Sequence, residues 1–251
     1  MRNQTKFNTC PDLIMVDLDN TLYSYTTAHG AAMNEVASIV SDRISLSPTE
    51  FDSLYSQARM AIKERIDGTA SSHSRLLYFQ HMLESIGLGN QVLLMMELEN
   101  AYWRTFLVNS RLYDGVLPLL ETARLASIPL CIVTDLCAQI QFKKLAYLGI
   151  ENYFDFVVTS EESGSDKPKA NSFKLAFEKH GRHVDTAWMI GDNVDADAYG
   201  AKLAVGAITL IRSSDTTKRE FENPHVDFQF SDFNAARILL EQLVDSAARS
   251  K

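Results

Sequence analysis

The sequence predicts an α/β fold in which a parallel sheet carries helices on both faces, with an all-helical segment inserted into it. Two observations support this prediction. From about residue 112 onward, short apolar segments alternate with segments whose apolar residues recur every three or four positions. Before that, one apolar segment near the amino terminus is followed by about ninety residues without a segment typical of a strand. Alternating strands and helices form parallel sheets, because each helix returns the chain to the same edge of the sheet.

Five segments have the pattern of strands that are buried on both faces. Each is short and largely apolar, and most are followed by a polar or glycine-containing break. Four helical patterns lie between the later segments, and Gly149 and Gly181 stand where helices are expected to end. The predicted strands are 13–16, 130–133, 156–158, 188–190 and 207–211, and the predicted helices are 116–127, 138–148, 173–180 and 197–204. Together these elements describe a Rossmann-like core.

The inserted segment reads as four helices. One of them begins with a capping box, in which Ser47 precedes Pro48 at the first helical position and Glu50 reaches back. The four predicted helices are 28–44, 48–66, 72–86 and 90–108, and polar loops are expected at 163–169 and 213–218. We therefore expect residues 1–23 and 112–251 to form the core and residues 24–111 to form a separate helical domain.

The composition excludes several classes of protein. The chain has 251 residues, of which 46% are hydrophobic and 22% are charged, as in ordinary globular domains. The net charge of −8 disfavours binding to a nucleic acid polymer, and no apolar run is long enough to span a membrane. Three cysteines without a CxxC spacing argue against a disulfide framework and a zinc site. Because the first ten residues also lack the apolar segment of a signal peptide, we expect a cytoplasmic protein.

Acidic residues follow two of the predicted strands. They are Asp17 and Asp19 after the first strand, and Asp192, Asp195 and Asp197 after the fourth. Asp17 and Asp19 are two residues apart, so they point to the same side of an extended chain, and two carboxylates about 4 Å apart repel by ~4 kcal/mol. Ligands of open α/β sheets bind beyond the carboxyl ends of the strands, so the pattern predicts a site for a hard cation such as Mg²⁺. The alternative is that these carboxylates cap backbone N–H groups, which suits Asp195 and Asp197 well.

A hydroxyl group and a cation follow two further predicted strands. Thr134 and Asp135 end the second strand, and Lys167 precedes Pro168 in the loop after the third. Taken singly, Thr134 is typical of a helix cap and Lys167 of a solvated surface. Together they supply the donor and the positive charge that a phosphate group needs beside a magnesium ion bound by carboxylates.

The order of these motifs resembles the haloacid dehalogenase superfamily of phosphatases and related phosphotransferases. The motifs are Asp-x-Asp-x-Thr-Leu, a strand ending in Thr, Lys-Pro, and Gly-Asp-x-x-x-x-Asp. The resemblance covers about residues 10–23 and 112–235, and the inserted helices are similar to the cap domain that this family carries between its first two motifs. It implies that the core carries out the chemistry and that the cap determines substrate specificity.

The resemblance implies catalytic roles for three residues. Asp17 is the nucleophile, which attacks phosphorus and becomes an aspartyl phosphate. Asp19 is the general acid that protonates the leaving alcohol and then the base that activates water. Lys167 bridges the nucleophile and the phosphate, and it is favoured over Lys169 because it precedes the proline. Division into two steps suits phosphate-monoester hydrolysis, which is very slow without a catalyst.

The resemblance also implies binding roles. Thr134 and the backbone N–H of Asp135 hold the phosphoryl oxygens. Because the family often has Asn at position 135, the Asp135 carboxylate is expected to point away from the phosphate. The residues implied to bind Mg²⁺ are Asp17, Asp19 through its backbone carbonyl, and Asp192, with Asp197 in support.

These roles predict a Mg²⁺-dependent phosphatase that acts on a small phosphorylated metabolite, either a sugar phosphate or a nucleoside monophosphate. A phosphomutase, a pyrimidine-type 5′-nucleotidase and a non-catalytic binding module remain open alternatives. Dehalogenation is disfavoured by Asp19, because that reaction needs no acid at this position. The candidates for substrate contact are Tyr23 and Arg75, although Arg75 also fits a solvated helix face. The sequence does not define the oligomeric state.

Overall fold

The computed structural model describes residues 7–213 and 223–249. The chain divides into two compact units by its internal contacts. Residues 1–23 and 112–251 form one, called the core unit here, and residues 24–111 form the other, called the helical unit. The expected loop at 213–218 lies, apart from Ser213, outside the described residues.

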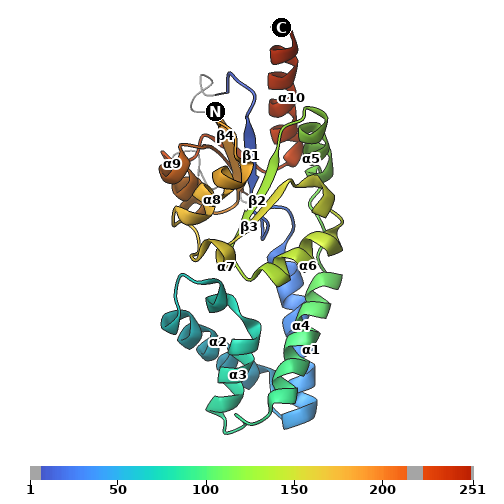
Figure 1. The fold of residues 1–251 in the computed structure, drawn as a ribbon. Coiled ribbons are helices and arrows are strands. Elements are labelled where there is room, and N and C mark those ends of the chain that lie inside the picture. Colours follow the sequence, from blue (N-terminus) through green and yellow to red (C-terminus); the bar gives the residue numbers. More distant parts are fainter. Residues whose placement is uncertain (1–6, 214–222, 250–251) are drawn as a thin grey trace. The chain divides into compact units, whose positions relative to one another are not determined.

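The core unit is built on a parallel sheet of six strands in the order β3-β2-β1-β4-β5-β6 (Figure 1). The strands are β1 (Leu13–Val16), β2 (Leu130–Thr134), β3 (Phe156–Thr159), β4 (Ala187–Gly191), β5 (Ile208–Arg212) and β6 (Phe228–Phe230). β1 lies between β2 and β4, with Met15 opposite Cys131 and Met189. All four residues of β1 are buried, which explains why its sequence is continuously apolar.

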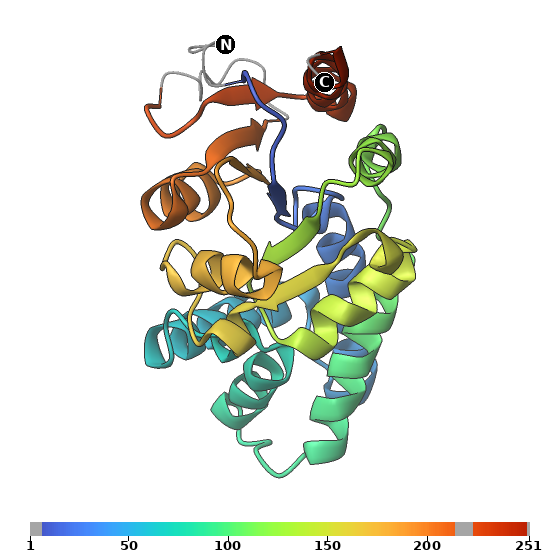
Figure 2. The ribbon, with the colours of Figure 1, turned by 45° about the horizontal axis from the view of Figure 1, so that its top comes forward.

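Helices cover both faces of this sheet, which confirms the predicted fold class. In Figure 1, α8 and α9 lie on one side of the strands, and α5, α6 and α10 lie on the other. Figure 2 shows the same two layers from a second direction. The helices are α5 (Val116–Leu125), α6 (Ala138–Leu148), α7 (Ser160–Ser163), α8 (Asn171–His180), α9 (Gly200–Val205) and α10 (Phe233–Arg249), with a 3₁₀ turn, η3 (Glu151–Tyr153).

The core unit differs from the prediction in several elements: η3, α7, β6 and α10 were not expected, and one predicted helix takes another form. β6 was not expected, because three residues at a sheet edge give too short a pattern to recognise. The helix predicted at 197–204 is instead a π-helical turn, η4 (Val194–Tyr199), followed by α9. The turn begins at Val194, before the predicted start at residue 197, because the Asn193 side chain accepts hydrogen bonds from the N–H groups of Asp195 and Ala196. Asn193, rather than Asp195, therefore caps this turn.

The helical unit consists of four helices and a short 3₁₀ turn. They are α1 (Tyr25–Ile44), α2 (Pro48–Arg65), η2 (Ala70–His73), α3 (Arg75–Ser85) and α4 (Val92–Val108). The capping box at the start of α2 is present, since Ser47 and Glu50 bond to each other's backbone N–H groups. Tyr55, Phe79 and Phe106 are among the buried aromatic side chains at its centre. No helix in the described part of the chain combines the length and the apolarity needed to cross a bilayer.

Candidate active site

The loops that follow β1, β2 and β4 meet at the carboxyl edge of the sheet, because the three strands are parallel neighbours. Asp17 follows β1, and its backbone N–H donates to the carbonyl of Ile190 in β4 at 2.9 Å. Thr134 ends β2, and Asp192 follows β4. The strand order thus brings together residues that are more than a hundred positions apart in the sequence.

Lys167 occupies the centre of an acidic cluster. Its ammonium group donates to a carboxylate oxygen of Asp17 at 2.6 Å and of Asp197 at 2.7 Å. Its remaining hydrogen reaches the backbone carbonyl of Val133 at 3.1 Å. Lys167 is only 8% exposed, so the alternative interpretation of this residue as a solvated surface lysine is wrong. Burial alone lowers the pKa of a lysine, but attraction to Asp17 and Asp197 outweighs it and raises the pKa of Lys167 well above its usual value.

Three carboxylates of this edge are close enough to share a cation. The acidic oxygens of Asp17, Asp192 and Asp197 all lie within 4.8 Å of one another. When all three are ionised, the single positive charge of Lys167 leaves two negative charges unneutralised. Burial and then repulsion by Asp17 and Asp197 raise the pKa of Asp192 to about 7. Burial, with a further contribution from Asp197, raises the pKa of Asp17 to about 6 despite the attraction of Lys167. The donor set and the charge imbalance both fit a hard divalent cation.

Asp197 supports this cluster from the loop after β4. One of its carboxylate oxygens accepts from Lys167, and the other accepts from the backbone N–H groups of Asp192 and Asn193 at 3.2 and 3.0 Å. A Cβ at Gly191 would collide with the Asp197 carboxyl group. Glycine at position 191 therefore permits the close approach that holds the loop in place.

Thr21 was not singled out by the sequence reasoning, although it belongs to the first motif. It is fully buried, and its hydroxyl group donates to Asp17 Oδ2 at 2.7 Å. The same hydroxyl lies 3.3 Å from Asp192 Oδ1. Thr21 thus links the carboxylates that follow β1 and β4. The sequence does contain a signal for Thr21: it stands four residues after Asp17, where an apolar strand passes into a loop.

Thr134 and Asp135 are both buried or nearly so at the end of β2. The Thr134 hydroxyl accepts from the side-chain amide of Gln141 at 2.6 Å, and α6 is capped by Cys137, so the helix-cap alternative for Thr134 is wrong. The Asp135 carboxylate accepts from the backbone N–H of Lys167 at 2.9 Å. Burial raises the pKa of Asp135. Its charge is thus directed to the loop that carries Lys167.

Asp19 has hydrogen-bond partners that differ from those of Asp17, Asp192 and Asp197. Both of its carboxylate oxygens lie 2.7 Å from Nζ of Lys144, a residue of α6 that is 1% exposed. Gln141 donates to Asp19 Oδ2 at 3.2 Å. Tyr23 is fully buried and its hydroxyl donates to Asp19, so Tyr23 belongs to this network, and its contact with substrate stays a prediction. Burial raises the pKa of Asp19, but the attraction and hydrogen bonds of Lys144 outweigh it, and the net pKa is lowered.

Arg75 lies within the helical unit and is only 7% exposed, so the alternative interpretation that it lies on a solvated helix face is wrong. Its guanidinium group donates to the carbonyl of His73 and to the hydroxyl of Tyr25. The rings around it are those of Tyr25, Tyr78, Tyr102 and Trp103, with centroids 5.2–5.8 Å from its Cζ. Its Nε has no hydrogen-bond partner among the described residues. Arg75 is therefore a buried cation surrounded by aromatic rings.

His29 lies beside this arginine in the helical unit. Its Nδ1 is 2.7 Å from the hydroxyl oxygen of Tyr102, and its ring stacks on that of Tyr25. Burial, followed by repulsion from Arg75 and Arg59, lowers the pKa of His29 to about 4. His29 is therefore uncharged at neutral pH beside the Arg75 cation.

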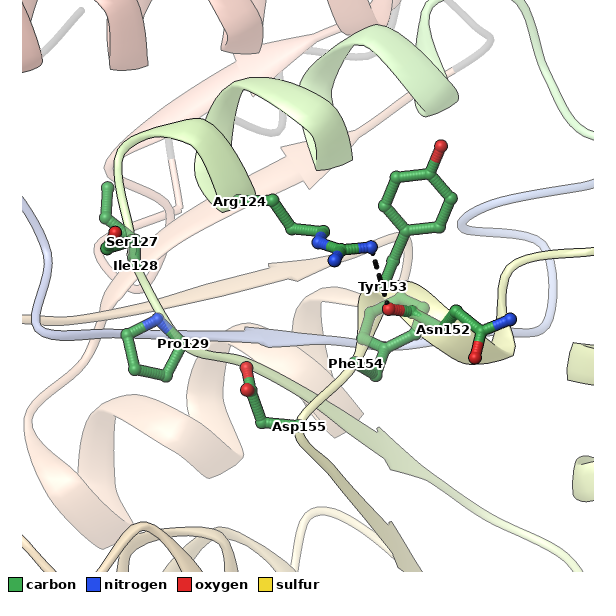
Figure 3. Close-up of a pocket in the computed structure, with 8 residues that line it drawn as sticks. All are labelled: Arg124, Ser127, Ile128, Pro129, Asn152, Tyr153, Phe154 and Asp155. Carbon is green, nitrogen blue, oxygen red and sulfur yellow. Dashed lines mark hydrogen bonds between the residues drawn. The ribbon is translucent and has the colours of Figure 1, made fainter.

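A separate cavity of about 280 Å³ lies at the opposite edge of the sheet (Figure 3). Its lining includes Pro129 and Asp155, which directly precede β2 and β3. Arg124 donates to the carbonyl of Asn152 at 3.0 Å, and Asp155 accepts from the N–H of Leu130 at 2.9 Å. These hydrogen bonds hold the chain where β2 and β3 begin. No residue that lines the cavity belongs to the cluster of Asp17, Asp192 and Asp197.

The parallel sheet and the carboxylates at its carboxyl edge are typical of a class of α/β enzymes. Comparison with known proteins identifies the family. The family model described as haloacid dehalogenase-like hydrolase matches residues 11–204. Ribulose-1,5-bisphosphate 5-phosphatase of Halopiger xanaduensis is 34% identical over 202 residues, which cover 79% of this chain and 83% of the relative. Glyceraldehyde 3-phosphate phosphatase of Methanopyrus kandleri is 30% identical over 225 residues, which cover 89% of this chain and 92% of the relative. The chain belongs to the haloacid dehalogenase-like hydrolase family, as the motifs predicted.

Solved structures show the same fold. A haloacid dehalogenase-type phosphatase from Thermococcus onnurineus has a TM-score of 0.69 at 23% identity, covering 91% of this chain and 97% of that chain. A 2-haloacid dehalogenase from Pseudomonas syringae has a TM-score of 0.74 at 20% identity, covering 92% of this chain and 98% of that chain. Proteins with different reactions in their names thus share this fold, so the reaction must be argued from the site.

Proposed function

We propose that this protein is a Mg²⁺-dependent phosphatase that hydrolyses a small sugar phosphate through an aspartyl phosphate on Asp17. The observation that supports it is the arrangement of Asp17, Lys167 and Asp192. One carboxylate is held by an ammonium group at 2.6 Å, while a second carboxylate lies within 4.8 Å of it. This arrangement suits a nucleophile beside a cation site at a sheet edge that binds phosphate.

The sugar-phosphate class is supported by the relatives. The two reported above are named for a ketose bisphosphate and a triose phosphate, and both are aligned over more than three quarters of this chain. Further relatives from Pyrococcus abyssi and Methanocaldococcus jannaschii are also named as glyceraldehyde 3-phosphate phosphatases. Among the substrates that the sequence left open, these names favour phosphorylated sugars over nucleoside monophosphates.

In the first step, an oxygen of Asp17 attacks phosphorus while the leaving alcohol receives a proton from Asp19. Lys167 and Thr21 orient Asp17, since they bond to its two carboxylate oxygens at 2.6 and 2.7 Å. Thr134 and the N–H of Asp135 hold the phosphoryl oxygens. In the second step, Asp19 takes a proton from the water that attacks the aspartyl phosphate.

Asp17, Asp192 and the backbone carbonyl of Asp19 would hold a Mg²⁺ ion, which would supply positive charge to the developing charge on the phosphoryl oxygens. Asp197 orients the loop that carries Asp192 through the backbone N–H groups it accepts from. Lys167 adds a fixed charge, because all three of its hydrogens have an acceptor in range.

We further propose that the helical unit is the specificity domain and that Arg75 in it binds an anionic group of the substrate. Arg75 is buried, and no carboxylate among the residues that the structure describes pairs with it, which is unusual because the burial of an unpaired charge is unfavourable. The polar groups that accept from Arg75 are uncharged, namely the carbonyl of His73 and the hydroxyl of Tyr25. Its unpartnered Nε retains a donor suited to a carboxylate or a phosphate.

The test is a panel of phosphate esters with release of inorganic phosphate as the readout. The panel contains glyceraldehyde 3-phosphate, ribulose 1,5-bisphosphate, ribose 5-phosphate, uridine 5′-monophosphate and 4-nitrophenyl phosphate. We expect the highest kcat/KM for a sugar phosphate, loss of turnover with EDTA, and recovery with added Mg²⁺. Equal turnover with and without EDTA would exclude the proposed metal role.

The nucleophile is tested by Asp17→Asn, which retains the shape of the side chain but not its charge. We expect a folded protein that forms no phosphoenzyme and has no measurable turnover. Asp185→Asn is the matched control, because Asp185 is a solvent-exposed carboxylate whose side chain is 82% accessible. Wild-type turnover by Asp17→Asn would show that the nucleophile is wrongly assigned.

A further inference from the structure

Helix α6 places a buried lysine in the core unit that none of the motifs includes. Lys144 is 1% exposed, and its Nζ lies 2.7 Å from each carboxylate oxygen of Asp19. A lysine is rarely buried to this extent without a specific partner. The neighbouring Lys143 is solvent-exposed, so the burial is specific to position 144.

Gln141 lies one helical turn before Lys144 and faces the same group. Its amide nitrogen is 3.2 Å from Asp19 Oδ2 and 2.6 Å from the Thr134 hydroxyl. It also lies 2.7 Å from the backbone carbonyl of Asp135. Residues three apart on a helix share one face, so α6 presents Lys144 and Gln141 together to the end of β2. The helix therefore connects Asp19 to the residues proposed to hold the phosphoryl group.

The Asp19 carboxylate is restrained from several directions. Lys144 contacts both of its oxygens, Gln141 donates to one of them, and the buried hydroxyl of Tyr23 donates to the other. Contacts on both oxygens restrict rotation about the side-chain bonds of Asp19. A general acid or base is effective only when its oxygen lies within hydrogen-bond reach of the proton it transfers.

We propose that Lys144 is a positioning residue of the reaction, which holds the Asp19 carboxyl group in the orientation needed for proton transfer. The inference rests on the proposed phosphatase function. When Asp17 bonds to phosphorus, the bond between phosphorus and the leaving oxygen breaks, and that oxygen takes the Asp19 proton. When water bonds to phosphorus, its proton goes to Asp19, and the bond between Asp17 and phosphorus breaks. Lys144 keeps its protons throughout, because a protonated Asp19 still offers it a carbonyl oxygen.

The test compares two leaving groups in Lys144→Met. An alkoxide is a poor leaving group and requires a proton, whereas 4-nitrophenolate leaves without one. We expect kcat/KM for the fastest sugar phosphate of the panel to fall roughly 10- to 100-fold, and kcat/KM for 4-nitrophenyl phosphate to stay within about twofold of wild type. The parameter kcat/KM is used because it reports only the steps up to the first irreversible one. A merely structural role would lower both values alike.

Two variants serve as controls. Lys143→Met changes the exposed neighbour and is expected to leave both substrates unaffected. Lys144→Arg retains a cation and is expected to recover part of the loss on the sugar phosphate. Equal losses on both esters, or no loss on either, would overturn the positioning role.

A double-mutant cycle with Asp19→Asn keeps the proposal testable if Lys144→Met alone fails to fold. The double variant removes both charges, so no unpaired carboxylate remains beside α6. If Lys144 acts through Asp19, the double variant will hydrolyse the sugar phosphate as fast as Asp19→Asn alone. A further loss in the double variant would refute the inference. A wild-type protein inactive on every ester would instead refute the proposed function, so the two failures are distinguishable.

Discussion

Replacement of Lys167 by methionine is the most informative perturbation of the core unit. The substitution keeps the length of the side chain but removes an ammonium group that is 2.6 Å from Asp17 and 2.7 Å from Asp197. Both aspartates are buried, at 6% and 1% exposure. Methionine would therefore leave two buried carboxylates facing each other without the ammonium group that pairs with both.

The magnitude follows from these distances. At an effective dielectric constant near 20, each ion pair at such a separation contributes about 6 kcal/mol of attraction, and burial of the ammonium group offsets several kcal/mol. Removal of one partner from a buried pair costs roughly 3–5 kcal/mol of the free energy of unfolding. For a chain of this size, that corresponds to a decrease in Tm of about 6–20 °C. Turnover is expected to be lost as well, because Lys167 orients the proposed nucleophile.

The assay is urea unfolding at pH 7.5 followed by tryptophan fluorescence. The chain has two tryptophans, Trp103 in the helical unit and Trp188 in β4. In a Trp103→Phe background, the signal comes from Trp188, so it reports on the core unit. Lys169→Met is the matched control, since Lys169 is exposed two residues away, and its midpoint is expected to stay unchanged. Equal midpoints for Lys167→Met and Lys169→Met would refute the reasoning.

Three further predictions concern single positions. Gly191→Ala is expected to lower the stability by roughly 1–3 kcal/mol, because its methyl group collides with Asp197, whereas Gly30→Ala in α1 meets no atom within 4 Å and should leave Tm unchanged or raised. His29 has a pKa of about 4 when folded and 6.5 as its reference, so the unfolded chain binds more protons between these values. The helical unit should lose stability as the pH falls through this window, and His29→Gln should flatten that slope in thermal melts. Arg75→Met should lower kcat/KM for ribulose 1,5-bisphosphate at least about tenfold more than for 4-nitrophenyl phosphate, because a charged hydrogen bond is lost only with the bisphosphate.

The sheet and the family could be predicted from the sequence because the patterns that indicate them lie within short segments of the chain. Strands β1, β2 and β4 are buried along their whole length. Each functional motif stands directly after one of these strands or, for Lys167, in the loop after β3. Asp17 after β1 and Asp192 after β4 could be placed at one edge from parallel-strand geometry alone. The capping box at Ser47 and Glu50 was equally readable, since its atoms belong to residues three apart.

The partners of Asp19 could not be predicted, because they depend on tertiary contacts. Lys144 is 125 positions from Asp19, and in the sequence it is one of two adjacent lysines in a helix. Only the packing of α6 shows which lysine is buried. Asp135 illustrates the same limit, since its carboxylate bonds to the backbone of Lys167, a contact that motif spacing does not contain.

The structure also explains how two carboxylates only two residues apart acquire different properties. Asp17 shares Lys167 with Asp197 and lies within reach of Asp192, so its surroundings contain an excess of negative charge. Asp19 has Lys144 as its own cation. Burial acts on both in the same direction, yet the pKa of Asp17 is raised to about 6 while that of Asp19 is lowered. The opposite directions therefore follow from the charges around each carboxylate and not from burial. The two buried lysines thus give the two aspartates separate partners, so replacement of Lys144 should act through Asp19, whereas replacement of Lys167 should affect both Asp17 and Asp197.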